Sequence, residues 1–462
     1  MIIYFILLYE MKYIGLFFST ILFSSVNSYS LPQIYKKNVD QKIFNVMKPA
    51  TINYIMVPFV GIVDTFWISK KGTITDIAAI GAADQIFFIF FSSLNFLPII
   101  LTPKISQLYN QKKSQEISNI LNISIFTTCL LSILSFTLIF NIEFIASLFM
   151  EKGSTVYIQS IEYLKCRTLG MPFSLYNCLI FSFMRGMFDY KSAIKMNGIT
   201  QIINLVLDPI MIDMIGMKGA AISTLFSECV CSIGFTYMLI KKQIFSKQFR
   251  NMFSILKDFI KQGSSVQIRI IMLQLLYIHM NKNILKMDIN GINMATQIII
   301  MKFMNIANIL YRSLSITSST IIPKSIMKNE DKTIQKRLLY WTNIIGFVQG
   351  VVFLNFGKYV HILTNDVNVI HLLKTLSKYV CFYQYLDGLH SVVEGILQGY
   401  QSFILPSTIS FLLYIPMFYF IQTSNNLVHL WTYINSFMIL KNVMYYIILT
   451  KNNKMVKKIK CR

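Results

Sequence analysis

Apolar runs long enough to cross a lipid bilayer recur along almost the whole chain. A helix needs about 20 mostly apolar residues to span the hydrocarbon core of a membrane. Inside that core the backbone finds no water to bind, so only helices or closed barrels can cross it. We therefore expect an all-α polytopic membrane protein with twelve transmembrane helices, at 48–69, 78–103, 117–141, 157–185, 192–213, 217–240, 255–285, 293–322, 337–360, 371–399, 402–421 and 427–449.

The charge of the chain predicts its topology rather than a nucleic-acid partner. Only 14% of the 462 residues are charged, against about 25% in a typical soluble protein. The net charge of +23 comes mostly from Lys and Arg in short loops and in the tail 451–462. These basic loops follow the even-numbered runs, so those loops and both termini are predicted to face the cytosol-like side. No basic, aromatic-bearing soluble segment is present, so we expect no nucleic-acid binding.

The first 47 residues leave the cellular location open. Residues 1–30 resemble a signal peptide or signal anchor, with Lys12 ahead of an apolar core and small residues. Residues 31–47 form a basic linker or targeting segment. Cleavage of an ordinary signal peptide would leave the new N-terminus on the lumenal side, whereas the loop charges place it on the cytosol-like side. Either the leader stays uncleaved in the plasma membrane or an internal one, or a bipartite leader directs the chain to a plastid-type envelope.

The two halves of the chain match weakly, with helix n answering helix n+6. An A-D-Q-I stretch at 83–86 answers A-T-Q-I at 295–298, T-P-K at 102–104 answers I-P-K at 322–324, and R-G at 185–186 answers E-G at 394–395. Because six is even, the halves share one topology and are parallel repeats. We expect two pseudo-symmetric six-helix bundles, 48–242 and 263–450, joined by a loop at 243–262. Substrate in such folds lies near the midplane between the bundles, which makes Gln85 and Gln297 candidate cavity residues.

Asn204 and Asp208 stand four residues apart within one apolar run. That spacing puts both side chains on the same helix face. An acid in a membrane helix is costly to insert and usually has a function. Pro209 lacks an amide hydrogen and can leave a carbonyl one turn back free to bind a cation. The alternative is a structural polar pair that closes a helix kink.

Several stretches resemble the multidrug and toxic compound extrusion (MATE) transporters, and most closely their DinF-like branch with plant and plastid members. They are P-F-V-G-I-V-D-T-F-W at 58–67, L-G-M-P-F at 169–173, R-G-M-F-D at 185–189, N-L-V-L-D-P at 204–209 and G-A-A-I-S-T at 219–224. The resemblance implies an antiporter in which two six-helix bundles alternate access. It also implies that the coupling cation, H⁺ or Na⁺, is held in the N-terminal bundle by Asp64, Tyr163, Asn177, Asn204, Asp208 and Thr224.

The chemistry of these residue types agrees with that role. Asp64 and Asp208, if close together in a low dielectric, could not both ionise cheaply and would share a proton or another cation. The neutral oxygens of the other four residues could hydrogen-bond the acid or complete the shell of a hard cation. Ordinary hydrogen bonding between helices is the alternative for the neutral residues.

A second set of ionisable residues lies in the C-terminal half. Glu394 stands where relatives carry an aspartate, and Asp387, His390 and Glu394 follow one helical stripe that could pass protons. A polar surface on a wet vestibule is the alternative. Arg269, Arg312 and Lys302 make this half unusually basic. Either they line the substrate cavity and favour an anionic solute, or they are ion-pair partners of the acids.

The sequence thus predicts a cation-coupled secondary antiporter that exports an organic solute or xenobiotic. A flippase for a lipid-linked headgroup, from the related superfamily, is the alternative. We expect no enzyme, because no catalytic His/Asp or Cys/His constellation and no G-x-x-x-x-G-K loop is visible. Cys229 and Cys231 face different sides of a helix, so we expect no metal site and no cofactor besides the coupling ion. The expected partners are the solute, the ion and lipid, and we expect a monomer.

Overall fold

The computed structural model describes residues 37–71, 73–245, 250–287, 291–355 and 366–450. The side chains at 37, 57–60, 62–65, 69, 71 and 74 are outside this description. The predicted leader and the basic tail also lie outside the described residues. The chain divides into two units, Met1–Phe44 and Asn45–Arg462. The first contributes only the start of α2, and the contacts reported below belong to the second.

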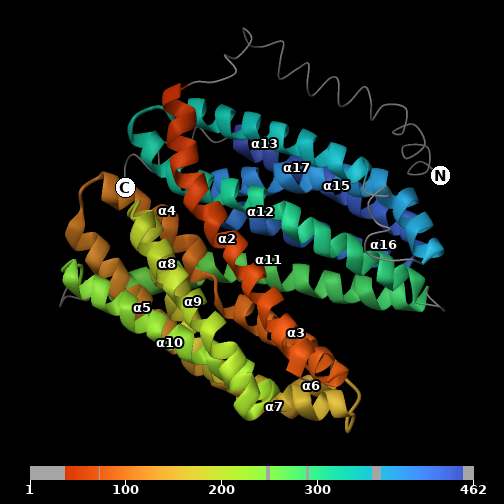
Figure 1. Cartoon of the computed structure of the whole chain (residues 1–462). Coiled ribbons are helices and arrows are strands. Elements are labelled where there is room, and N and C mark those ends of the chain that lie inside the picture. Colours follow the sequence, from red (N-terminus) through yellow and green to blue (C-terminus); the bar gives the residue numbers. More distant parts are fainter. Residues whose placement is uncertain (1–36, 72, 246–249, 288–290, 356–365, 451–462) are drawn as a thin grey trace. The chain divides into compact units, whose positions relative to one another are not determined.

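Every regular element among the described residues is an α-helix (Figure 1). The helices are α2 (Lys37–Lys71), α3 (Ile74–Leu94), α4 (Leu97–Asn110), α5 (Ser114–Phe140), α6 (Ile142–Ser147), α7 (Thr155–Leu169), α8 (Met171–Gly186), α9 (Tyr190–Ile215), α10 (Met217–Lys241), α11 (Met252–Lys286), α12 (Ile292–Met327), α13 (Asp331–Leu354), α15 (Val367–Gly399), α16 (Ile404–Gln422) and α17 (Leu427–Thr450).

Two of the predicted spans are broken into helix pairs. The span predicted at 78–103 is α3 followed by α4, and the span predicted at 157–185 is α7 followed by α8. In each pair the second helix has a proline in its first turn, Pro98 in α4 and Pro172 in α8. Proline is tolerated there because the first amides of a helix have no intrahelical acceptor. The prediction of one continuous helix at each of these places was therefore wrong. The apolar pattern on which it was based continues across the break and does not reveal it.

The helices group into two bundles (Figure 1). In the N-terminal bundle α3 packs on α7, α4 and α5 on α8, and α10 on both α7 and α9. In the C-terminal bundle α15 packs on α12, α13 and α17, while α16 packs on α11 and α17. Two buried apolar clusters each lie within one bundle, and a third joins the N-terminal bundle to Phe259 and Val266 of α11 and to Phe403. The architecture predicted from the sequence, two six-helix bundles of parallel repeats, is confirmed.

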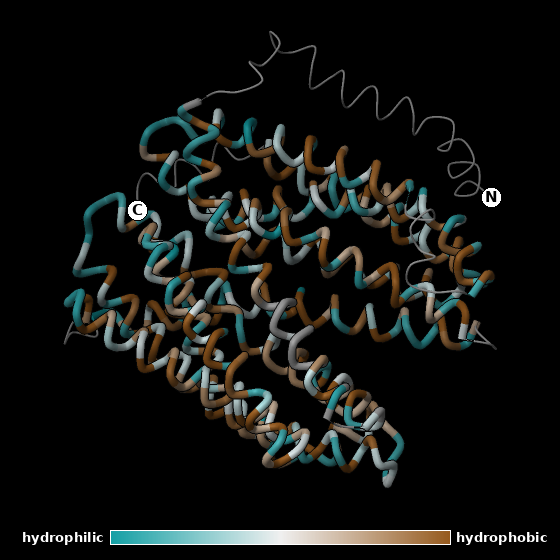
Figure 2. Tube along the Cα trace, viewed as in Figure 1, coloured by the Kyte–Doolittle hydropathy of each residue, from teal (hydrophilic) through white to brown (hydrophobic). Residues whose placement is uncertain are grey.

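The surfaces of these bundles suit lipid. Hydrophobic residues recur along the helices of both bundles (Figure 2). Many large apolar side chains are exposed, among them Phe140 at 85% and Phe253 at 87%. Seven of the described helices are long and apolar enough to cross a membrane: α3, α5, α9, α10, α12, α13 and α16. Hydrophobic surface on this scale would not be stable in water. The chain is an integral, multi-pass membrane protein.

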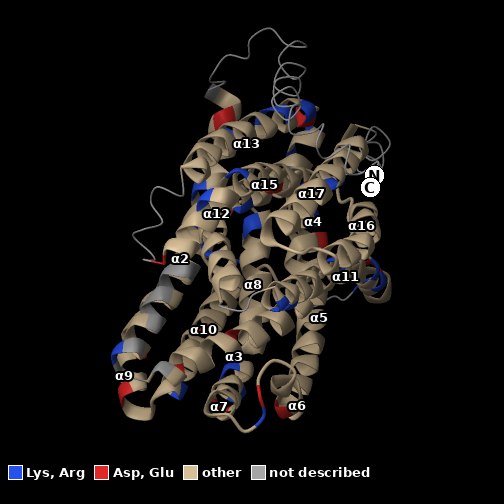
Figure 3. Ribbon diagram, turned by 90° about the vertical axis from the view of Figure 1, so that its right-hand side faces the viewer, with Lys and Arg blue, Asp and Glu red and all other residues tan. Residues whose placement is uncertain are grey.

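The two bundles touch where α4 meets α12 and α15, and also where α11 packs against α3, α4 and α5. The Ser106 hydroxyl donates to the Thr320 carbonyl at 2.7 Å, and the Gln401 amide donates to Gln107 Oε1 at 2.5 Å. Lys324 lies 4.4 Å from the ring centroid of Phe188. These residues are near helix ends that lead into basic loops, where Lys and Arg gather (Figure 3). The bundles are therefore in contact on the side that loop charge assigns to the cytosol.

Candidate functional site

A buried polar cluster joins α9 to α10 in the N-terminal bundle. The Asn204 amide donates to Asp208 Oδ2 at 2.9 Å, as the spacing of the two residues predicts. The Ser223 hydroxyl donates to the other oxygen of Asp208. Ser227 donates to Asn204 Oδ1 at 3.4 Å. None of the four is more than 2% exposed, so this cluster holds a carboxyl group out of contact with water.

Asp208 is buried without a resident cation among the described residues. Its side chain is 0% exposed, and the ion pairs of the described residues do not include it. Its two hydrogen-bond donors, Asn204 and Ser223, are neutral. A buried carboxylate whose donors are all neutral keeps an uncompensated charge, which is costly in a low dielectric. A proton or a small cation would remove that cost.

Ser223, and not Thr224, supplies the hydroxyl that contacts Asp208. The Thr224 hydroxyl donates to the Ala220 carbonyl of its own helix at 2.8 Å. Adjacent residues on a helix are about 100° apart, so only one of the two can face Asp208. The residue implied by the resemblance is therefore displaced by one position in this chain.

Asp64, the other acid of the expected pair, lies in α2. Its side chain is outside the described residues, so its proximity to Asp208 stays a prediction.

Tyr163 and Asn177 belong to a second cluster, built from α3, α7, α8 and α10. Tyr163 donates to Asp84 Oδ1 at 3.2 Å. The Asn177 amide donates to the Glu228 carbonyl at 2.9 Å and its oxygen accepts from Ser232 at 2.8 Å. The described contacts of Tyr163 and Asn177 do not reach Asp208, so these two residues of the expected set lie in a different cluster from Asn204 and Asp208.

An ion pair at the centre of this second cluster was missed by the sequence reasoning. Arg167 Nη1 lies 3.3 Å from Glu228 Oε1, and both side chains are less than a fifth exposed. Ser174 donates to the same carboxylate. The Arg167 guanidinium also lies 4.2 Å from the ring centroid of Phe87 and interacts electrostatically with Asp84. A signal was available, because each residue is a charge within a predicted span and such charges come in pairs.

In the C-terminal bundle Glu394 is already paired. Arg269 Nη2 lies 2.5 Å from Glu394 Oε1, and His390 Nε2 lies 3.4 Å from Oε2. The Gln398 amide donates to Glu394 Oε1 at 2.9 Å. Arg269 is 8% exposed. Of the two roles left open for Arg269, the internal ion pair is the one found, and its assignment to the lining of a substrate cavity stays a prediction.

Asp387 makes its described hydrogen bond across the bundle, away from its own helix. It accepts from the Asn308 amide at 3.0 Å, and its charge interacts with Lys441 and Arg312. His390 and Glu394 contact one another directly, whereas Asp387 joins them only electrostatically. Of the predicted stripe, His390 and Glu394 are therefore in contact, whereas Asp387 interacts with Glu394 only over a longer distance. Lys441 was not among the residues singled out from the sequence.

The two glutamines assigned to the substrate cavity differ in environment. Gln85 is exposed on α3. Gln297 is 1% exposed and accepts from the Trp431 indole at 3.2 Å. Trp431 and the neighbouring Ile300 belong to a buried apolar cluster, and the assignment of Gln297 to the substrate cavity stays a prediction. Arg312 is exposed on α12, and it interacts electrostatically with Tyr54 of α2 and with Asp387.

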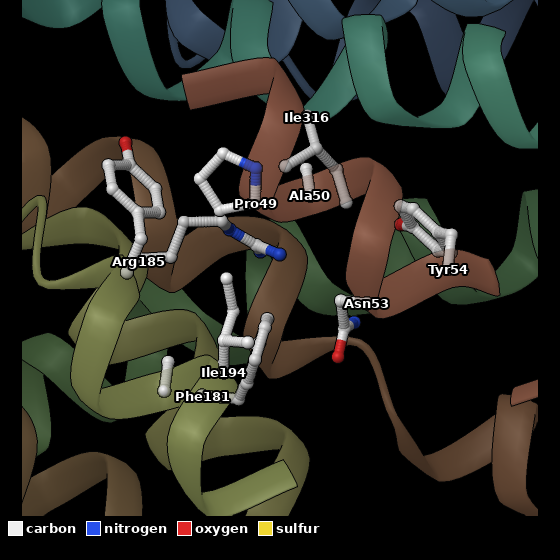
Figure 4. Close-up of a pocket in the computed structure, with 10 residues that line it drawn as sticks. Pro49, Ala50, Asn53, Tyr54, Phe181, Arg185, Ile194 and Ile316 are labelled. Atoms are coloured by element: carbon white, nitrogen blue, oxygen red, sulfur yellow. The ribbon is translucent and has the colours of Figure 1, made fainter. Parts of the chain in front are cut away.

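A pocket on the basic side lies between the bundles (Figure 4). Its lining comes from α2, α8 and α9 with Ile316 of α12: Pro49, Ala50, Asn53, Tyr54, Phe181, Arg185, Tyr190, Ala193, Ile194 and Ile316. Arg185 donates to Thr102 at 2.8 Å and to Ser182 at 3.2 Å. Arg185 is thus held by neutral hydroxyls next to the place where the bundles meet.

Comparison with known proteins agrees with this architecture. The MatE family model matches residues 49–210. Protein DETOXIFICATION 42 of Arabidopsis thaliana is 23% identical over 263 residues, which are 55% of this chain and 50% of that protein. The match thus spans about half the length of this curated relative.

Solved structures share the fold over nearly the full chain. A crystal structure of MATE in complex with MaD5 has a TM-score of 0.78 at 16% identity, covering 93% of this chain and 99% of that one. An outward-facing multidrug resistance MATE family transporter of the MOP superfamily has a TM-score of 0.74 at 19% identity, covering 91% and 97%. A MOP superfamily transporter from Pyrococcus furiosus has a TM-score of 0.74 at 16% identity, with the same coverage. Together with the family model that matches residues 49–210, they show that the chain is similar to the multidrug and toxic compound extrusion (MATE) transporters and has the fold of the solved ones.

Proposed function

We propose that the chain is a cation-coupled secondary antiporter, in which entry of H⁺ or Na⁺ drives export of an organic solute from the cytosol-like side, where the basic loops lie. The observation that carries the proposal is the fully buried Asp208, whose described hydrogen-bond donors are neutral. Such a group binds a cation when buried and releases it when hydrated. A change in its exposure during the cycle would therefore couple ion binding to conformation.

The contact between the bundles supports an alternating-access cycle. The described contacts at Ser106, Gln107 and Lys324 close the basic side. Whereas the apolar packing of α11 on the N-terminal bundle is more extensive, these polar and cation–ring contacts can break and re-form at modest cost. Opening them would expose the solute path to the cytosol-like side, and ion binding at Asp208 would bias which side is open.

The solute class stays a proposal of its own. Arg312 is exposed and interacts electrostatically with residues of both bundles. A cationic side chain between the bundles favours an anionic solute such as a carboxylate. The exposed acid Asp84 in the N-terminal bundle favours a cation instead. Transport of both classes therefore has to be measured.

The test is flux into proteoliposomes that contain the full chain. A pH jump or a Na⁺ gradient is imposed, and uptake of labelled citrate (an anion) and tetraphenylphosphonium (a cation) is measured separately. Asp208→Asn is expected to lower gradient-driven flux roughly tenfold or more, which corresponds to about 1.4 kcal/mol in the barrier. Asp213→Asn is the matched control, because Asp213 is exposed near the end of the same helix. Undiminished flux through Asp208→Asn would contradict the mechanism.

A further inference from the structure

Two turns on the basic side, one in each bundle, end their helices in the same way. Gly186 is the last residue of α8 and Gly399 the last of α15. Two residues further on, the backbone is left-handed, at Phe188 with φ 62° and at Gln401 with φ 54°. Each of these amides donates to the carbonyl three residues back, and the next amide donates to the carbonyl five residues back. This is the Schellman cap, in which the left-handed residue is usually glycine.

The two glycines also pack in equivalent ways within their own bundles. A Cβ on Gly186 would lie 2.8 Å from Ile105 Cβ of α4, and a Cβ on Gly399 would lie 2.7 Å from Ile322 Cβ of α12. The helices α4 and α12 carry the matching T-P-K and I-P-K stretches of the two repeats. The two turns therefore occupy corresponding places, related by the pseudo-two-fold axis along the membrane normal.

The side chains of the two left-handed residues cross to the opposite bundle. Gln401 donates to Gln107 Oε1 at 2.5 Å, and the Phe188 ring centroid lies 4.4 Å from Lys324 Nζ. In both cases the residue that is contacted lies two positions beyond the isoleucine that packs on the glycine. A two-fold interface makes each of its contacts twice. The bundles are thus joined at two corresponding points, by an amide hydrogen bond at one and a cation–ring contact at the other.

A side chain at these two positions needs a reason, because glycine adopts the left-handed backbone without a steric cost. The same cap ends α4 at Lys112 and α10 at Gln243, with φ 58° and 53°. Those two side chains are exposed, and no described contact joins them to the other bundle. Phe188 and Gln401 differ from them in reaching across, so replacement by glycine would remove an inter-bundle contact and leave the cap intact.

We propose that Phe188 with Lys324 and Gln401 with Gln107 form a two-point latch that holds the basic side closed. A rigid-body movement that separates the bundles on this side breaks both contacts together. Resting on the proposed antiport function, the inference adds that the latch sets the fraction of chains open to solute from the cytosol-like side. That fraction scales the apparent affinity for the solute.

The first test measures the separation of the bundles directly. Spin labels are placed at Gln115→Cys and Lys332→Cys, which are exposed in the first turns of α5 and α13. The full chain, with its seven native cysteines replaced by alanine, is measured in lipid nanodiscs by double electron–electron resonance. Phe188→Gly and Gln401→Gly are each expected to raise the long-distance fraction about threefold or more, because each destabilises only the closed state. Gln243→Gly, at the same kind of cap, is the matched control.

The second test approaches the cation–ring contact from the other bundle, and it decides the case in which Phe188→Gly does not fold. Lys324→Gln is expected to raise the long-distance fraction, while Lys324→Arg keeps a cation over the ring and is expected to match the parent. Lys328→Gln removes an exposed lysine one turn away and is the control.

Combined variants separate one contact from two. Phe188→Leu with Lys324→Gln is expected to open no further than the more open of the two single variants, since both changes remove the same contact. Phe188→Leu with Gln401→Gly is expected to multiply the two single effects, since these changes remove different contacts.

Three outcomes would overturn the latch. They are long-distance fractions of Phe188→Gly and Gln401→Gly equal to that of Gln243→Gly, equal opening by Lys324→Arg and Lys324→Gln, and a lower fraction in a latch variant than in the parent.

Transport tests the consequence of the latch. In proteoliposomes, variants that open more are expected to show a lower KM for the solute on the basic side and to keep the ion dependence of the parent. An unchanged KM in a variant that opens more would contradict the assigned role. If the parent moves neither citrate nor tetraphenylphosphonium, the proposed function fails, while the distance measurements still decide whether the latch exists.

Discussion

Asp208 and Asp387 are both acids in the interior of a helical bundle, and their partners make them different. Asp208 accepts from Asn204 and Ser223, while Asp387 accepts from Asn308 and interacts with Lys441. The described donors of both acids are neutral, and Asp387 in addition interacts electrostatically with a lysine of its own bundle. The i, i+4 relation of Asn204 and Asp208 was derivable from the sequence because both belong to one helix. Ser223 was not, because the register between α9 and α10 decides which hydroxyl faces the acid.

At this scale we predict that Ser223→Ala is more harmful than Thr224→Val. Removing a donor to a buried carboxylate costs about 1–3 kcal/mol. The Thr224 hydroxyl returns to the Ala220 carbonyl of its own helix, so Thr224→Val is expected to cost less than about 1 kcal/mol. The measurement is the free energy of unfolding of each variant in mixed micelles. Equal losses would show that Ser223 is not the donor on which Asp208 depends.

Among the helices, proline and glycine decide where elements end and how closely they pack. Pro98 and Pro172 begin α4 and α8, which interrupts two spans that the hydropathy pattern reads as continuous. The motif at Glu394 and Gly395 suggested a functional acid, but the glycine is required by the packing of α15 on α12. A Cβ on Gly395 would lie 2.2 Å from the Ser315 carbonyl oxygen of α12. Only a residue without a side chain lets α15 approach α12 this closely.

Gly395→Ala is therefore expected to push these two helices apart. Overpacking of this kind costs about 1–3 kcal/mol, which outweighs the gain of about 1 kcal/mol in helix propensity. The matched control is Gly81→Ala in α3, where a Cβ meets nothing within 4 Å. Thermal unfolding in detergent should show a lower midpoint for Gly395→Ala and an unchanged or higher one for Gly81→Ala. A Gly395→Ala midpoint equal to that of the parent would contradict the packing argument.

On the scale of the whole molecule, the bundles meet through few contacts on the basic side. Gln107 of α4 touches Gln401, which follows α15, and Ser106 bonds to α12. The bundles also meet at α11, whose Phe259 and Val266 belong to a buried cluster of the N-terminal bundle. A rigid-body movement that opens the basic side would have to break the polar contacts of α4 with α12 and Gln401.

We predict that linking Gln107→Cys to Gln401→Cys stops transport. A short, reducible bis-methanethiosulfonate linker is expected to lower flux in proteoliposomes to the level of empty vesicles, and reductant should restore it. The single variants, treated alike, correct for the native cysteines. Tyr176→Cys with Thr236→Cys is the matched control within one bundle, since these hydroxyls lie 2.7 Å apart on α8 and α10. Full transport through the linked inter-bundle pair would rule out opening at this contact.

The sequence by itself determined the fold class, the number of spans, the two-bundle repeat and the candidate acids. Hydropathy over about 20 residues and the i, i+4 spacing are local properties of the sequence. A charged residue within an apolar run can also be recognised from the sequence alone, because its insertion into the membrane is costly. Tertiary structure alone decided which charge meets which: Arg167 with Glu228, and Arg269 with Glu394. Those pairs join helices far apart in the chain, and their register depends on close packing at residues such as Gly395, which no local pattern encodes.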